Sequence, residues 1–185
     1  MLGFGEHKPV RHDPRTLTLN RNLLLHSTHP GSMMTIENLF DADGLARTKA
    51  RINALRPDTP AQWGKMNVAQ MLAHCNVAYE IEYTDKHPAP GAFARLMIKL
   101  FAKNQVVGPK PYPRNGRTAP MFVIADERDF AHERQRLLDH LDKTHDLGAA
   151  HYDGKVNQGF GKLSLAEYNT LFSKHLDHHL TQFGV

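Results

Sequence analysis

Apolar residues recur at three- and four-residue spacing over five stretches of the chain, and this pattern predicts five helices. The stretches are 36–56, 68–84, 91–103, 126–143 and 165–182. Such spacing gathers apolar side chains on one face of a helix, which then packs against other helices. No sustained alternation of apolar and polar residues indicates strands. We therefore expect an all-α fold, a four-helix bundle with one additional helix.

Proline, glycine and capping residues mark where these helices begin and end. Residues 104–125 carry Gly and Pro at short intervals, which predicts a long irregular crossover, and residues 144–163 hold four glycines, which predicts a loop. Asn67 is a suitable N-cap for the second helix. Ser164 and Glu167 form an S-x-x-E capping box at the start of the last helix.

The first 33 residues differ from the rest of the chain. They contain several Gly and Pro residues and a single short apolar run. We therefore expect a mostly disordered extension over 1–33, followed by a bundle domain over 34–185. Met33 and Met34 directly precede the first predicted helix, so either is an alternative start of translation.

Composition narrows the functional classes. Lys and Arg exceed Asp and Glu by four, but these charges are scattered, which does not favour nucleic-acid binding. No apolar run approaches the roughly 18 residues of a membrane span, and the N-terminus lacks the pattern of a signal peptide. The single cysteine, Cys75, excludes an internal disulfide. We expect a cytoplasmic protein with neither nucleic acid nor a membrane as partner, and exposed bundle faces would allow a homodimer.

The last predicted helix carries three histidines within five positions, and they are not equivalent. Helical geometry places His179 inside the apolar stripe and His175 at its edge, whereas His178 lies on the polar side. His175 and His179 are therefore neighbours on adjacent turns that point into the bundle. Their buried nitrogens need partners, which either hydrogen bonds or a divalent metal ion can supply.

The second predicted helix offers a third inward histidine. His74 lies at the border of its apolar stripe, whereas Asn76 and Glu80 lie on the opposite face. Ligands on facing helices can converge in the core of a bundle, so a three-histidine metal site is one hypothesis. A core of hydrogen-bonded histidines without a metal is the other. The other histidines of the domain lie on loops or exposed turns and are expected to be solvated, namely His87, His132, His140, His145 and His151.

Two motifs resemble the DinB-like superfamily, and in particular a bacterial branch of it that consists of domains of unknown function. They are WGKMNVAQMLAHC at 63–75 and FGKLSLAEYNTLFSKHLDHHLTQFG at 160–184. The resemblance implies a four-helix bundle in which three histidines hold a divalent metal. On this sequence they fall on His74, His175 and His179, and we expect the metal to be Zn, Ni or Mn.

The resemblance also suggests a class of chemistry. Relatives in the superfamily look like thiol-dependent transferases and isomerases, and others are described as metal-dependent hydrolases. We therefore expect a small-molecule substrate at an open coordination position, with a low-molecular-weight thiol as a candidate co-substrate. The alternative is a helical bundle that binds a metal or a small molecule without catalysis.

Three further residues are candidates for the site. Tyr168 is the candidate for a catalytic hydroxyl, and Gln70 and His178 are candidates for contacts that support the metal ligands or the substrate. The chain departs from the family pattern at one point. Asn157 and Gln158 stand where the branch usually has His-Pro before F-G-K-L, so contacts made by that loop are expected to differ.

Overall fold

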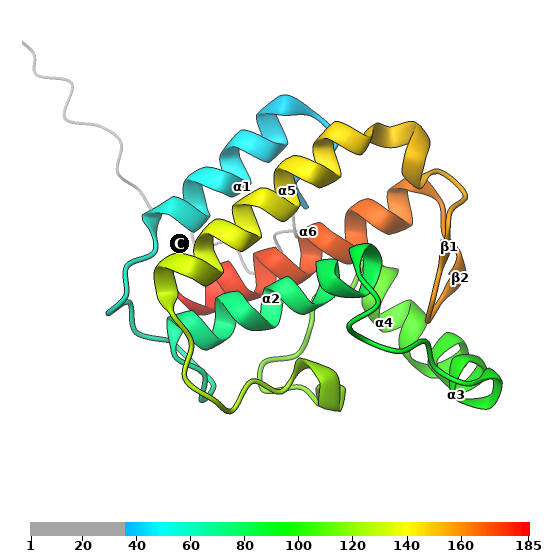
Figure 1. The fold of residues 1–185 in the computed structure, drawn as a ribbon, viewed down its shortest axis with the longest axis horizontal. Helices are drawn as coiled ribbons and strands as arrows, with labels where there is room; N and C mark the ends of the chain where they lie inside the picture. The colour runs from blue at the N-terminus through cyan, green and yellow to red at the C-terminus, as the bar shows by residue number, and fades with distance from the viewer. Residues whose placement is uncertain (1–35) are drawn as a thin grey trace, which may run out of the picture. The chain divides into compact units, whose positions relative to one another are not determined.

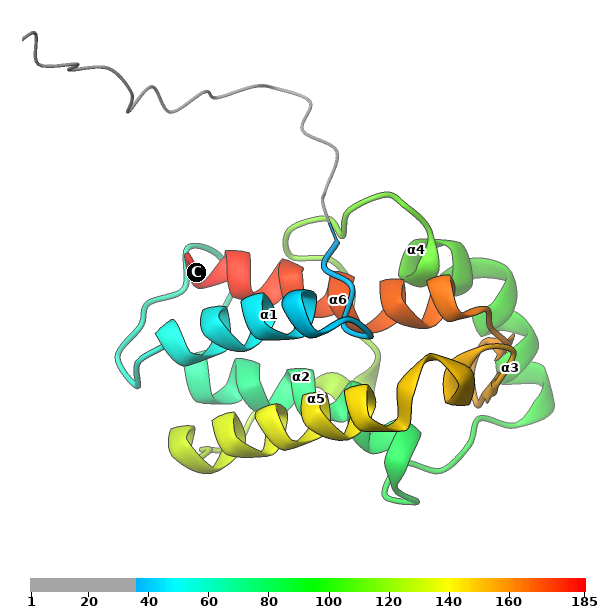
Figure 2. The same cartoon turned by 90° about the horizontal axis from the view of Figure 1, so that it is seen from above.

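Four helices form the bundle in the computed structural model, which describes residues 36–185 (Figure 1). The predicted extension over 1–33 lies outside the described residues. The bundle helices are α1 (Ala42–Ala54), α2 (Val68–Tyr83), α5 (Phe130–Tyr152) and α6 (Leu165–Gln182). Figure 2 shows these helices running side by side, seen from above. The predicted all-α bundle is confirmed.

The additional helix lies in the chain between α2 and α5. It consists of α3 (Ala92–Met97), the π-helical segment η1 (Ile98–Ala102) and α4 (Lys103–Val107), which follow one another without a break. An irregular stretch then leads through the 3₁₀ turn η2 (Pro120–Phe122) to α5. None of the helices in residues 36–185 combines the length and the apolar content that crossing a bilayer requires.

Local capping explains why α2 and α6 begin where the sequence predicts. The side chain of Asn67 accepts from the backbone N–H of Gln70, and the Gln70 side chain accepts from the backbone N–H of Asn67. Ser164 and Glu167 make the same reciprocal pair at the start of α6. Each capping box satisfies backbone donors that the first helical turn leaves without partners.

The bounds of α1 and α5 differ from the predicted ones. α1 begins at Ala42 rather than near residue 36, because the Asp41 side chain caps it by accepting from Gly44 N–H. α5 continues to Tyr152, far into the predicted loop, and Gly148 provides a kink with φ 74° in place of a helix end. The remainder of that loop forms a short antiparallel hairpin of β1 (Val156–Asn157) and β2 (Gly161–Lys162).

The core lies where the four bundle helices meet, and α2 is its central element. Side chains on every side of α2 are buried, so this helix has no solvated face. The largest fully buried apolar and aromatic side chains of the core are Leu39, Ile52, Leu55, Met71, Leu72, Tyr79, Leu137, Leu141, Tyr152, Tyr168 and Phe172.

The polar face of α2 packs against α5, which corrects the sequence-based picture of this face. Asn76 donates to the backbone carbonyl and the carboxylate of Glu133, and His140 Nδ1–H donates to Asn76 Oδ1 at 2.9 Å. The His140 ring stacks on Tyr79. His140 is thus half-buried rather than solvated, because α5 covers the side of α2 that an isolated helix would leave to water.

Glu80 is the charged centre of this interface. Its carboxylate pairs with Arg136 of α5, with Lys86 at 2.8 Å and with His87 at 2.8 Å, and its side chain is only 6% exposed. Burial alone would raise the pKa of Glu80. The hydrogen bonds from Lys86, His87 and Arg136 outweigh burial and lower the pKa to about 2.

Replacing Glu80 by Gln is expected to lower the free energy of unfolding by about 1–3 kcal/mol at neutral pH, because charge-assisted hydrogen bonds are lost. The folded pKa of about 2 lies below the ordinary value of 4.5, so the unfolded chain takes up the proton first as the pH falls. The stabilisation is therefore complete above about pH 4.5 and disappears as the pH falls towards 2. Denaturant titrations of both proteins across this range measure the difference.

Glu127 offers a matched control, because it is exposed just before α5. Glu127→Gln should leave the free energy of unfolding within about 0.5 kcal/mol of the wild type at each pH. A Glu80→Gln protein as stable as the wild type at neutral pH would contradict the importance given to this ion-pair group.

Candidate metal centre

Three histidines from two helices converge inside the bundle. His74 comes from α2, and His175 and His179 come from adjacent turns of α6. One ring nitrogen of each lies within 4.8 Å of the others, and His74 Nε2 lies 2.9 Å from His175 Nε2. The ring centroids are 4.5–4.9 Å apart. The structure therefore brings together the three residues that the sequence singles out.

The second ring nitrogen of two of these histidines is fixed by an oxygen acceptor. His74 Nδ1–H donates to the Phe122 carbonyl at 2.8 Å, and His179 Nδ1–H donates to Gln182 Oε1 at 2.8 Å. Gln182 Nε2 in turn donates to the Trp63 carbonyl at 2.6 Å. A proton held on Nδ1 leaves the Nε2 lone pair free, and it also fixes the orientation of the ring.

Burial keeps the three imidazoles uncharged. It is the largest cause of the lowered pKa of His74, it lowers the pKa of His179 to about 3, and together with the neighbouring histidines it lowers the pKa of His175 well below the ordinary value. Neutral imidazole is the form that ligates metals. At neutral pH the cluster therefore presents lone pairs, with no proton to displace from Nε2 of His74 and His179.

This arrangement fits a divalent metal ion. Two nitrogen lone pairs 2.9 Å apart repel each other unless a shared proton or a cation lies between them. No aspartate, glutamate or cysteine joins the group among residues 36–185, so the donor set is three imidazoles, which suits Zn and neighbouring transition metals. Three protein ligands leave at least one coordination position open. The three histidines, two of them buried and His175 partly exposed, could thus hold a metal ion.

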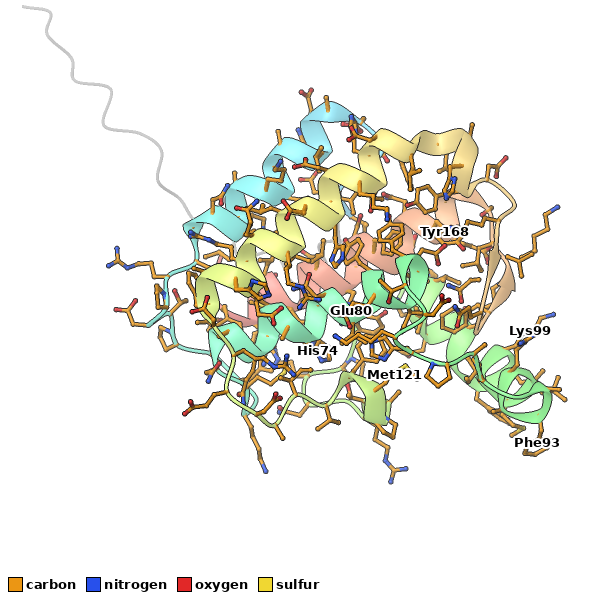
Figure 3. The ribbon with its side chains drawn as sticks, in the orientation of Figure 1. His74, Glu80, Phe93, Lys99, Met121 and Tyr168 are labelled. Atoms are coloured by element: carbon orange, nitrogen blue, oxygen red, sulfur yellow. The ribbon has the colours of Figure 1, made fainter. Side chains whose placement is uncertain are left out.

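A cavity of about 520 Å³ adjoins the three histidines. Side chains from α2, α6, the crossover, the residue 63–66 loop and the β1–β2 hairpin line it. In Figure 3, His74 lies on α2, the helix of Glu80, and Met121 is drawn below that helix; both residues line the cavity. The volume of the cavity falls within the range of roughly 300–1,000 Å³ that is usual for sites that bind small molecules. The open side of the three-histidine cluster therefore faces a space large enough for a ligand.

His178 lies in the wall of this cavity rather than in solvent. Its ring contacts Trp63, Tyr112 and His179, with centroids 5.9, 5.6 and 4.9 Å away. Burial is the largest cause of its lowered pKa. His178 is outside the group that could ligate one ion, so its place is beside the ligands, facing the ligand space.

Gln70 and Tyr168 are not brought to the histidines. Gln70 completes the cap of α2, and its Nε2 donates to the Asp126 carbonyl. Tyr168 packs on Tyr152 and Phe172, its hydroxyl donates to Glu82 Oε1, and it is absent from the cavity wall. Figure 3 shows Tyr168 well apart from His74. Neither residue therefore makes a contact with the three histidines that would support its expected role at the site.

The β1–β2 hairpin, which holds Asn157 and Gln158, reaches the cavity. Asn157 is buried, and its Oδ1 accepts from the backbone N–H groups of Gly159 and Phe160. Gln158 Nε2 donates to the Ile81 carbonyl. Both side chains line the cavity, so this loop contributes to the ligand space.

Two partners of the site could not be chosen from the sequence. Gln182 lies three residues after His179 on the same helix, which is a weak signal for a hydrogen bond to that histidine. The Phe122 carbonyl carries no signal at all, because every residue has a carbonyl group. Only the folded crossover places η2 against α2.

Comparisons with known proteins identify the family but not an activity. A family model described as a protein of unknown function (DUF1569) matches residues 34–184. No curated protein and no solved structure matches the chain. The family match contains the whole bundle and all three histidines. The chain thus belongs to the DUF1569 family of proteins of unknown function.

Proposed function

We propose that this protein is a metal-dependent enzyme that acts on a small molecule in the cavity beside His74, His175 and His179. The observation that carries the proposal is the convergence of three neutral imidazoles on one point, with two of them oriented by oxygen acceptors behind them. Zn, Ni or Mn would suit these donors. The resemblance to the DinB-like superfamily supports the same ligand set.

A divalent ion at this point would supply Lewis acidity and would lower the pKa of a water or thiol at its open position. The residues around it would do the rest. The Phe122 carbonyl and Gln182 would hold the two imidazoles in place, and the largely apolar cavity wall would limit the access of bulk water.

The cavity wall favours chemistry in which the metal activates the nucleophile. No Asp or Glu is among the residues that line the cavity, so no carboxylate is positioned there as a general base. Thiol-dependent transfer and hydrolysis can both proceed without a carboxylate base, because each can begin with a thiol or a water that is made more acidic by the metal. A low-molecular-weight thiol is thus a candidate co-substrate.

The first test is metal content. Protein produced without a His-tag is expected to bind about one divalent ion per chain, and His74→Ala, His175→Ala and His179→Ala should each reduce the bound metal several-fold, because two imidazoles bind an ion far less tightly than three. Elemental analysis after dialysis measures this. His178→Ala is the matched control from the same helix and should retain the metal.

The metal site would be refuted by two results together. The wild-type protein would contain no metal, and the His175→Ala and His179→Ala variants would keep full stability and show no change in metal uptake. The three residues would then form a hydrogen-bonded histidine core.

The second test is turnover. Metal-loaded protein is expected to accelerate attack of a small thiol on 1-chloro-2,4-dinitrobenzene, or hydrolysis of a p-nitrophenyl ester, and to lose at least about 10² of this rate on metal removal or in His74→Ala, since the nucleophile is then no longer activated. Spectrophotometry follows both products. His132→Ala, at an exposed position of α5, is the control. Binding of small ligands with no turnover by either chemistry would indicate a non-catalytic binding protein instead.

A further inference from the structure

The cavity beside the histidines extends along α2, and its wall away from them is mostly apolar. Along α2 it is lined by His74, Ala78 and Ile81, which lie on one face of the helix and span about 10 Å at 1.5 Å per residue. Beyond Ile81, the wall is continued by His87, Pro88 and Pro90 of the segment between α2 and α3.

The opposite wall has the same polarity gradient. Leu171 of α6 lies one turn before His175, and Ile98, Ala102 and Val106 of the helical crossover segment line the cavity at four-residue spacing. Phe160 of the hairpin also lines the cavity. The polar side chains in this part of the wall already have partners: His87 Nε2 lies 2.8 Å from Glu80 Oε2, Asn157 Oδ1 accepts from two backbone N–H groups of the hairpin, and Gln158 Nε2 donates to the Ile81 carbonyl. Lone pairs for a ligand's head are therefore found at the three histidines, whereas the part of the wall away from them offers mainly apolar contacts.

We propose that the cavity binds an amphiphilic small molecule whose metal-binding head lies at the three histidines and whose apolar tail extends towards Ile81, Ile98 and Phe160. The position of the head rests on the proposed metal site, whereas the position of the tail does not. The absence of carboxylates from the wall fits a head that is neutral or anionic, because an anionic head would meet no like charge there.

A homologous series of straight-chain alkyl hydroxamates, from butyl to dodecyl, tests both halves of this proposal. Hydroxamate is a metal-binding head, and the chain is a tail of adjustable length. Binding to metal-loaded protein is expected to tighten by about fourfold per added methylene until the tail fills the cavity, and then to level off. Removal of the metal should weaken every member by a similar factor and leave the dependence on chain length intact. Isothermal titration calorimetry measures both.

Two variants test the tail space by introducing a phenylalanine side chain into the cavity wall. Ala78→Phe and Ala102→Phe are expected to abolish the gain from long chains, because each introduces a large side chain into the tail space while leaving the histidines untouched. Two variants are used in case one of them does not fold, and circular dichroism shows whether each variant is folded. Ala94→Phe, at an exposed position of α3 outside the cavity wall, is the matched control and should bind like the wild type.

The outcomes separate the two ideas. Affinity that ignores chain length, with or without metal, would overturn the proposal for the tail even if the hydroxamate head still needs the metal. Affinity that grows with chain length but is the same with and without metal would uphold the tail and overturn the metal-bound head. The proposed position of the tail would also be overturned if the Ala78→Phe and Ala102→Phe proteins fold and still bind dodecyl hydroxamate as tightly as the wild type.

Discussion

Three uncharged imidazoles held against one another in a buried place are the constraint on which the rest of this site depends. Each ring has two nitrogens, and burial makes an unpartnered or charged one costly. The Nδ1 groups of His74 and His179 are satisfied by the Phe122 carbonyl and by Gln182. Since Gln182 also binds the Trp63 carbonyl, the ends of two separate loops are fixed by the same histidines. The orientation of the ligand lone pairs and the position of these two parts of the cavity wall are therefore linked.

The far wall of the cavity is fixed by a different buried group. Lys174 is fully buried on α6, and its Nζ donates to the carbonyls of Gln105 and Gly108 at 2.7 Å each. Burial lowers the pKa of this lysine. The carbonyls at the C-terminal end of α4 are natural partners for a cation, because the helix dipole places partial negative charge there. This contact holds α4 against α6, and so it keeps Val106 in the cavity wall.

The sequence predicts those features well that depend only on residues close together in the chain. The starts of α2 and α6 follow from capping boxes that lie entirely within four residues, and the inward direction of His74, His175 and His179 follows from helical geometry. The errors arise where a helix is treated as having water on its polar side. The crossover covers Lys174 and His178, so both are buried or half-buried, although each lies on the polar side of an isolated helix. The contacts that bury Lys174 are made by residues 66 and 69 positions away, and no local pattern specifies them.

The crossover helix must serve two apolar faces, and its irregular middle explains how one short helix can do so. Ile98, Ala102 and Val106 face the cavity, whereas Phe93, Leu96 and Leu100 face outwards. The π-helical segment η1 spans Ile98–Ala102, where the inner set begins and the outer set ends. An extra residue in a turn rotates the following side chains relative to the preceding ones, and such bulges are frequent at functional sites. A single helix thus carries part of the cavity wall on one face and exposed apolar side chains on the other, about one helix diameter of 10 Å apart.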